Sequence, residues 1–182
     1  MKQNGFILLV SLIFMVIMTM LGIFMFGGVS MDEKMSGNQR EKSRSLDAAQ
    51  TTLNSTENWL SNPGNTVCGG SLCAGVSPCS GTGILTVAAA AACNPNPSDP
   101  STWTSVMTYA PASSVMAVST TGGLNTYYSN PQYYIQFLGF APGTTNTGYY
   151  QVTAAAQGGN NTATTVVQAV YRVKAKSVDL GG

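Results

Sequence analysis

The stretch FILLVSLIFMVIMTMLGIFMFGGV, from Phe6 to Val29, contains no charged side chain in its 24 residues. Fourteen residues between Phe6 and Phe26 are Phe, Ile, Leu or Val. About 20 apolar residues cross the hydrocarbon core of a bilayer, and these side chains favour insertion by about 4–8 kcal/mol before the penalties for glycine and threonine. A cleaved secretory signal has a shorter apolar core of about 7–15 residues. We therefore expect residues 6–29 to form a retained membrane span.

A polar segment with helical character, residues 30–60, continues directly from this span. One helix from Phe6 to Leu60 would be roughly 80 Å long, at about 1.5 Å per residue. The sequence Asn62-Pro63-Gly64-Asn65 should end it, because proline and glycine both break helices. The remaining chain, residues 61–182, is then expected to lie at the carboxyl end of the helix.

Side chains at a spacing of three and four form a stripe on the second half of this helix. Its members are Met31, Met35, Asn38, Lys42, Leu46, Ala49, Leu53 and Leu60. We expect the part from Leu46 to Leu60 to dock the carboxyl domain. The part that carries Met31, Met35 and Asn38 has too few partners in its own chain, so we expect it to meet neighbouring subunits.

Two further features of the helix concern local packing. Gly22 lies in the second half of the membrane span, where glycine permits either a close approach of another helix or a tolerated kink, and both interpretations stay open. Glu41 and Arg44 have the i,i+3 spacing of an ion pair that contributes a few tenths of a kcal/mol when exposed.

Cys68, Cys73, Cys79 and Cys93 lie within 26 residues of one another. An even number of cysteines in a Gly/Ser/Pro-rich region is typical of two disulfides formed in an oxidising compartment. The alternative is a zinc site, but no C-x-x-C pair and no histidine are present. Four cysteines allow three pairings; short loops favour Cys68–Cys73 with Cys79–Cys93, and the other two pairings stay open.

The cysteines also bear on orientation across the membrane. Lys34, Arg40, Lys42 and Arg44 follow the span, and counted alone they would place its carboxyl side in the cytoplasm. These basic residues are interleaved with acidic ones on a helix that we expect to pack, so we give the disulfides more weight. The carboxyl domain is then periplasmic.

The last third of the chain predicts an antiparallel meander. Residues 133–138, 149–156 and 166–173 have the half-polar pattern of strands, and Gly158-Gly159-Asn160-Asn161 suits a hairpin turn. Covered by the helix, this sheet would make an α+β fold: a long amino-terminal helix packed on a carboxyl-terminal antiparallel sheet. Before it, residues 83–92 are ambiguous between strand and helix, and Asp99-Pro100 predicts the start of a short helix over residues 101–109.

Composition excludes several functions. The net charge of +1 gives no field that would attract nucleic acid. The chain has no histidine, and Asp99 is the only charged residue between Asn58 and Tyr171, so nucleophilic triads, carboxylate pairs and calcium cages lack their groups. We expect no enzymatic activity, no cofactor and no metal.

The leader Met1–Gly5, followed by Phe6, resembles the cleavage site of a type IV prepilin, with Gly5 at the −1 position. The stretch MDEKMSGNQR at residues 31–40, running into SLDAA at residues 45–49, resembles the amino-terminal signature of PilX-type minor pilins. PQYYIQFLG at residues 131–139, YYQVT at residues 149–153 and residues 166–172 resemble strands of the same family. The resemblance implies a pilin fold, cleavage between Gly5 and Phe6 by prepilin peptidase, and N-methylation of Phe6.

The fifth residue after the implied cleavage site departs from most pilins. Most members carry a glutamate there, which neutralises the amino terminus of a neighbour, whereas this chain has Val10. PilX-type proteins generally share this lack. The resemblance therefore implies a subunit near the fibre tip, with Val10, Gly22, Met31, Met35 and Asn38 on the assembly surface of the helix.

We therefore divide the chain into a leader (1–5), a membrane segment (6–29), an amphipathic helix (30–60), a disulfide-containing variable region (61–130) and a β-meander (131–182). The expected function is a minor pilin in a tip or initiation complex that primes pilus polymerisation and supports motility or adhesion. Expected partners are other minor pilins, the major pilin, prepilin peptidase, the inner membrane and a tip adhesin. Alternatives are an adhesive surface module, a pseudopilin of a type II secretion system, and a bitopic membrane protein that keeps its leader.

Overall fold

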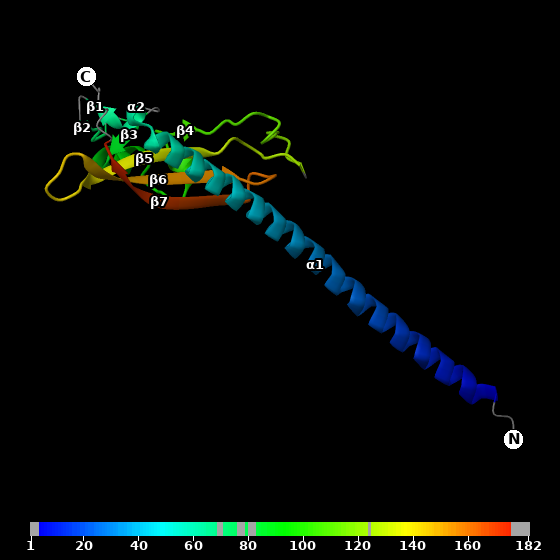
Figure 1. Cartoon of the computed structure of the whole chain (residues 1–182). Helices are drawn as coiled ribbons and strands as arrows, with labels where there is room; N and C mark the ends of the chain where they lie inside the picture. Colours follow the sequence, from blue (N-terminus) through cyan, green and yellow to red (C-terminus); the bar gives the residue numbers. More distant parts are fainter. Residues whose placement is uncertain (1–3, 69–70, 76–78, 80–82, 124, 176–182) are drawn as a thin grey trace. The chain divides into compact units, whose positions relative to one another are not determined.

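The structure is a computed structural model that describes residues 4–68, 71–75, 79, 83–123 and 125–175. Its elements, shown in Figure 1, begin with a helix α1 that runs from Asn4 to Ser61. The chain divides into two units, residues 1–40 and 41–182, which we describe separately.

The first unit consists of the amino-terminal part of α1. Phe6–Met25 is long and apolar enough to cross a membrane, and none of it is buried within the structure. Residues 6–25 of the predicted span are therefore helical, with apolar side chains that do not pack within the chain. Met1–Gln3 of the predicted leader lie outside the described residues.

The second unit is built on a sheet of five strands in the described residues: β3 (Ile84–Thr86), β4 (Met107–Thr108), β5 (Gln132–Phe140), β6 (Thr147–Gln157) and β7 (Thr164–Lys174). Strands β5, β6 and β7 pair antiparallel in sequence order, which confirms the predicted meander. Strand β3 adds parallel to β5, and β4 adds antiparallel to the same edge. The sequence left residues 83–92, which contain β3, open between strand and helix, and it did not predict β4.

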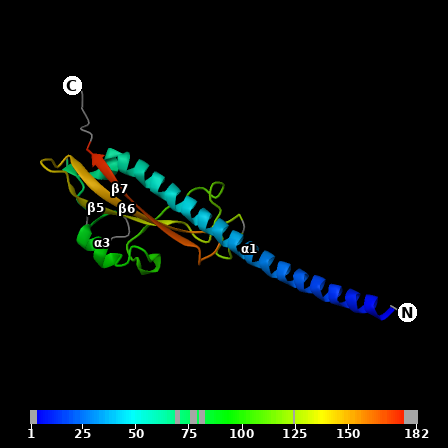
Figure 2. The ribbon, with the colours of Figure 1, turned by 90° about the horizontal axis from the view of Figure 1, so that it is seen from below.

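The carboxyl-terminal half of α1 covers one face of the sheet (Figure 2). Leu60 of the helix is buried with Ile135 and Phe137 of β5 and Tyr150 and Val152 of β6. Further along the helix, the buried residues are small: Ser45, Ala48, Ala49, Thr52 and Thr56. Ala48 and Ala49 pack with Ala156 of β6, and Ser45 Oγ hydrogen-bonds Thr165 Oγ1 of β7 at 2.5 Å, so small side chains fill this part of the helix–sheet interface.

The predicted docking stripe is confirmed at Ala49, Leu53 and Leu60 and is wrong at Leu46. Leu46 is 39% exposed, whereas its neighbour Ser45 is fully buried. The error arose because apolar residues were assumed to face the sheet. Buried hydroxyl groups can instead satisfy themselves on the helix backbone: Thr52 Oγ1 donates to Ala48 O at 2.8 Å and Thr56 Oγ1 donates to Thr52 O at 2.8 Å.

Helix α3 (Val87–Cys93) covers part of the opposite face (Figure 2). It packs with Trp103, whose ring meets Tyr134 edge-on at 5.1 Å. The ambiguous segment 83–92 thus contains both a strand, β3, and a helix. Thr86 separates them as the N-cap, its side chain accepting from Ala89 N.

The helix predicted over residues 101–109 is wrong. Asp99 does cap a turn, but this is the short 3₁₀ helix η1 (Pro100–Thr102). The amides of Thr104 and Ser105 are bound by the side chain of Asn94, so they cannot donate along a helix. The chain then extends into β4.

A second, smaller sheet follows the end of α1. Helix α1 ends at Ser61, as the Pro-Gly sequence predicted, and a four-residue helix α2 (Pro63–Thr66) follows. Strands β1 (Val67–Cys68) and β2 (Ser71–Leu72) then form a hairpin. Leu72 is buried in the main core and ties this hairpin to the domain.

Candidate functional site

The apolar surface of α1 is the first candidate site. Phe6 and Val10 are 73% and 43% exposed, and Met31 and Met35 are 76% and 73% exposed. Asn38 is also exposed, and a Cβ atom added at Gly22 would meet nothing within 4 Å. These residues lie along one helix and are not brought together at one point. Such a surface packs against lipid or against other helices and supplies no reactive group.

A cluster that the sequence predicted only in part lies where the second unit begins. We call the Glu41 and Arg44 side chains, together with the loop groups they bind, the helix–loop clamp. Arg44 Nη1 contacts Glu41 Oε1 at 3.0 Å, which is the predicted ion pair, and each side chain is only 16% exposed. Arg44 Nη2 donates to Thr126 O at 2.5 Å, and its guanidinium lies 5.0 Å from the centre of the Tyr127 ring.

The other half of the clamp holds the β6–β7 turn. Glu41 Oε2 accepts a hydrogen bond from Gly159 N. A Cβ atom at Gly159 would lie 2.7 Å from the backbone oxygen of Gly123 as well as 2.7 Å from that carboxylate oxygen, so glycine is required for this approach. Arg44 Nη1 also donates to Gly123 O at 3.2 Å. Two loops distant in sequence are thus bound to one turn of the helix. The sequence predicted the Glu41–Arg44 pair but not its attachment to these loops.

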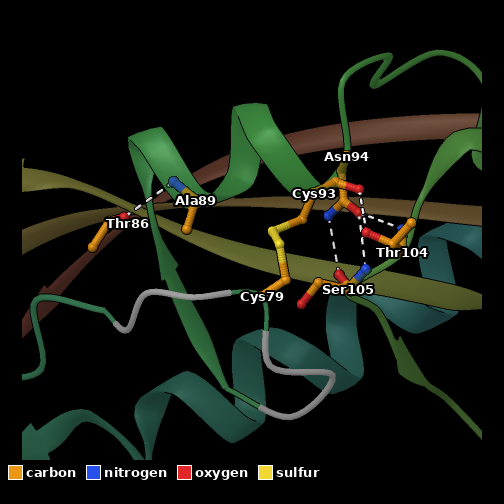
Figure 3. Close-up of a disulfide and its surroundings, with 7 residues drawn as sticks. All are labelled: Cys79, Thr86, Ala89, Cys93, Asn94, Thr104 and Ser105. Atoms are coloured by element: carbon orange, nitrogen blue, oxygen red, sulfur yellow. Dashed lines mark hydrogen bonds between the residues drawn. A yellow bond between two sulfur atoms is a disulfide. The ribbon is translucent and has the colours of Figure 1, made fainter.

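The disulfides are Cys68–Cys73 and Cys79–Cys93, the pairing that short loops favoured. Cys68–Cys73 closes the β1–β2 hairpin. Cys79–Cys93 ties the chain before β3 to the end of α3 (Figure 3). Both link segments within the carboxyl domain, which is consistent with an oxidising compartment.

Asn94, the residue after Cys93 of the second disulfide, binds the chain at Thr104 and Ser105 through its side chain (Figure 3). Its side chain is 2% exposed; Nδ2 donates to Ser105 O at 3.0 Å, while Oδ1 accepts from Thr104 N at 3.0 Å and Ser105 N at 3.2 Å. Cys93 O accepts from Thr104 N at 3.0 Å. A buried amide with every group bonded fixes one conformation of its loop.

Tyr150 connects the first disulfide to the core. The residue is fully buried, and its hydroxyl donates to Cys73 O at 3.0 Å. Burial raises the pKa of Tyr150 to about 12, because the phenolate would lose its hydration. The tyrosine therefore acts as a neutral donor that holds the hairpin on the sheet.

A metal centre finds no support in the part of the chain that the structure describes. There, no group of three or more His, Cys, Asp or Glu side chains could hold a metal ion. The site is a packing surface joined to a cross-linked domain.

Two family models match the sequence. One, described as the C-terminal part of the type IV pilus assembly protein PilX, matches residues 42–173. The chain belongs to the PilX family of type IV pilus assembly proteins. The second model, the PilX N-terminal region, matches residues 4–54. Searches of curated proteins and of solved structures found no match.

The two PilX models overlap over residues 42–54, and the start of the C-terminal model coincides with the start of the second unit. The C-terminal match begins at Lys42, next to Glu41, the first residue of the second unit. The N-terminal match contains the whole apolar segment Phe6–Met25. The apolar helix and the disulfide-linked domain are therefore both parts of one pilus assembly protein. The PilX family is a family of pilus assembly components and not an enzyme family.

Proposed function

We propose that this PilX-family protein is a minor pilin of a tip or initiation complex that primes pilus polymerisation. The observation that carries the proposal is the exposed apolar helix Phe6–Met25 on a chain whose family assembles type IV pili. Exposed apolar surface of this extent is stable only in lipid or against other apolar helices. Pilus assembly would move the helix from lipid into contact with other apolar helices.

Val10 supports the position near the tip. By the family resemblance, most pilins have a glutamate here that pairs with the amino terminus of a neighbour. A carboxylate inside a membrane is costly and is retained only where it functions. A subunit with Val10 offers no such pairing group, which suits a subunit with no neighbour above it.

The same proposal includes processing and location. Cleavage after Gly5 by prepilin peptidase would make Phe6 the amino terminus, and N-methylation of Phe6 would follow. Before assembly the helix would lie in the inner membrane with the disulfide-linked domain in the periplasm. After assembly the protein would lie at the pilus tip with other minor pilins, the major pilin and an adhesin as neighbours.

Gene deletion with complementation tests priming. We expect deletion to abolish or greatly reduce surface pili, measured by electron microscopy and by the yield of sheared fibres, and the wild-type gene to restore them. Gly5→Leu should leave an uncleaved precursor by mass spectrometry and fail to restore pili, whereas the control Gln3→Ser should be processed. Normal piliation of the deletion strain would exclude the priming role, and an unchanged mature mass for Gly5→Leu would exclude the cleavage site.

An adhesive module is a second candidate, because the carboxyl domain has a polar cleft of about 770 Å³. Its lining is mostly hydroxyl and amide side chains: Ser98, Ser101, Ser129, Gln132, Gln157, Asn161 and Thr164. Lys42 and Asp99 line it as well, and hydroxyl and amide groups with one charge of each sign suit polyhydroxylated surfaces. If this role is the main one, pili will persist after deletion while adhesion falls. A type II secretion pseudopilin would instead show a secretion defect with unaltered pili.

A further inference from the structure

We propose that the outer edge of β7 accepts an extended segment of a partner protein as an added strand, and that this segment carries acidic side chains beside Arg172 and Lys174. The inference is separate from the priming role, because it concerns the carboxyl domain alone. Strand addition uses backbone hydrogen bonds for affinity and alternate side chains for specificity.

Two hydrogen bonds fix which backbone groups of β7 are free. Ala175 N donates to Asn146 O at 2.7 Å, so the odd-numbered residues of β7 use their backbone groups to bond toward β6. Thr164 O instead accepts from Lys42 Nζ at 2.6 Å, on the side away from β6. Antiparallel pairs alternate between the two arrangements. The outward groups therefore belong to Val166, Gln168, Val170, Arg172 and Lys174.

This edge lacks two of the usual protections against strand addition, although it carries the charged residues Arg172 and Lys174. Among the described residues β7 pairs with β6 alone, over 11 residues and with a continuous register. It contains no proline and no bulge, two devices that commonly block sheet edges. Lys42 occupies the edge at Thr164, which leaves Val166 to Lys174 open and fixes where an added strand would begin.

The surroundings of the edge define the chemistry of the partner. Val170 is 57% exposed, and Arg172 and Lys174 follow it on the same face of the strand, so acidic side chains suit that face. On the other side, a groove of about 260 Å³ lies between the end of α1 and β7 and is lined by Glu57 and Tyr171 among others. Leu60, Tyr171 and Val173 also line this groove, so apolar side chains suit that face, although Arg172 and Lys174 reach it as well. The partner strand should alternate acidic residues on one face with apolar residues on the other.

Hydrogen exchange on the full-length protein in detergent micelles tests this. The probes are the peptides acetyl-TVTVEVET-amide and acetyl-TEVEVTVT-amide, which present the pattern in both chain directions, with lysine-for-glutamate versions as controls. We expect at least one acidic peptide to slow exchange about tenfold at the outward amides of Gln168, Val170 and Arg172. The inward amides of Val167 and Ala169 already bond to β6 and should change little. No protection by either acidic peptide, or equal protection by the lysine peptides, would overturn the proposal.

A proline variant provides the second arm. Val170→Pro removes an outward N–H and no ladder hydrogen bond, so the sheet should form while peptide protection is lost. The matched control Val170→Thr should keep it. Because Val170→Pro could fail to fold, Arg172→Glu with Lys174→Glu is measured in parallel and should reverse the preference to the lysine peptides. An unreversed preference, or binding that survives in a folded Val170→Pro, would contradict strand addition at this edge.

Discussion

Replacing Arg44 tests the helix–loop clamp quantitatively. Arg44→Leu keeps an apolar stem but removes the hydrogen bonds to Gly123 O and Thr126 O, the ion pair with Glu41 and the contact with the Tyr127 ring. Hydrogen bonds from a charged group contribute about 1.5–3 kcal/mol each, and a cation–π contact near the surface about 0.5–1 kcal/mol. Because these terms share one side chain and are not additive, we expect a loss of about 3 kcal/mol in the free energy of unfolding.

Arg44→Lys separates charge from geometry. A lysine ammonium keeps the attraction to Glu41 but cannot present the planar fork that reaches both loop carbonyls, so we expect it to recover no more than about half of the loss. The control is Ser43→Ala, an exposed neighbour on the same helix, which should change stability by less than about 0.5 kcal/mol.

The assay is denaturant unfolding of the full-length protein in micelles, followed by tryptophan fluorescence. Trp59 and Trp103 are the only tryptophans and both lie in the second unit, so they report on the domain that the clamp stabilises. Hydrogen exchange should also quicken in residues 119–127 and at the β6–β7 turn, and little elsewhere. A loss below about 0.5 kcal/mol for Arg44→Leu, or equal losses for Leu and Lys, would refute the reasoning.

Three other perturbations follow from the packing. Ala49→Leu, at a fully buried helix position, should destabilise the domain by about 1–3 kcal/mol or more through overpacking, while Gln50→Leu on the exposed side should be near neutral; equal thermal midpoints would contradict the close helix–sheet approach. Cys79→Ala with Cys93→Ala removes the second disulfide, whose cysteines are 14 residues apart, and should lower the free energy of unfolding by about 3 kcal/mol. An unchanged denaturation midpoint would show that this disulfide does not stabilise the domain. Burial raises the pKa of Tyr150 from 10.0 to about 12, so the stability that its buried neutral hydroxyl contributes is fully present below pH 10 and falls by roughly 2–3 kcal/mol as the pH rises toward 12. Tyr150→Phe should reduce this alkaline loss of stability, measured as the free energy of unfolding against pH. An equal slope in both proteins would contradict the role of Tyr150.

Local patterns in the sequence determined several parts of the structure. The exposed apolar helix Phe6–Met25 follows from an uninterrupted apolar run, and the meander from alternating residues between turn sequences. The end of α1 at Ser61 follows from Pro63 and Gly64, which act within a few residues. The preferred disulfide pairing joined the first cysteine to the second and the third to the fourth, and the structure has that pairing. The PilX family resemblance was carried by short stretches at both ends of the chain.

Contacts between distant segments were decided by the tertiary structure. Asn94 prevents the helix predicted over residues 101–109 by binding amides ten and eleven residues away. Which helix face docks depended on the small residues of β6, so Ser45 is buried and Leu46 is exposed. The partners of Arg44 lie 79 and 82 residues further along the chain. The free edge of β7 likewise exists only because strand order leaves it last in the sheet. Hydrophobic pattern and turn propensity are local properties, whereas these features depend on which surfaces the folded chain brings together.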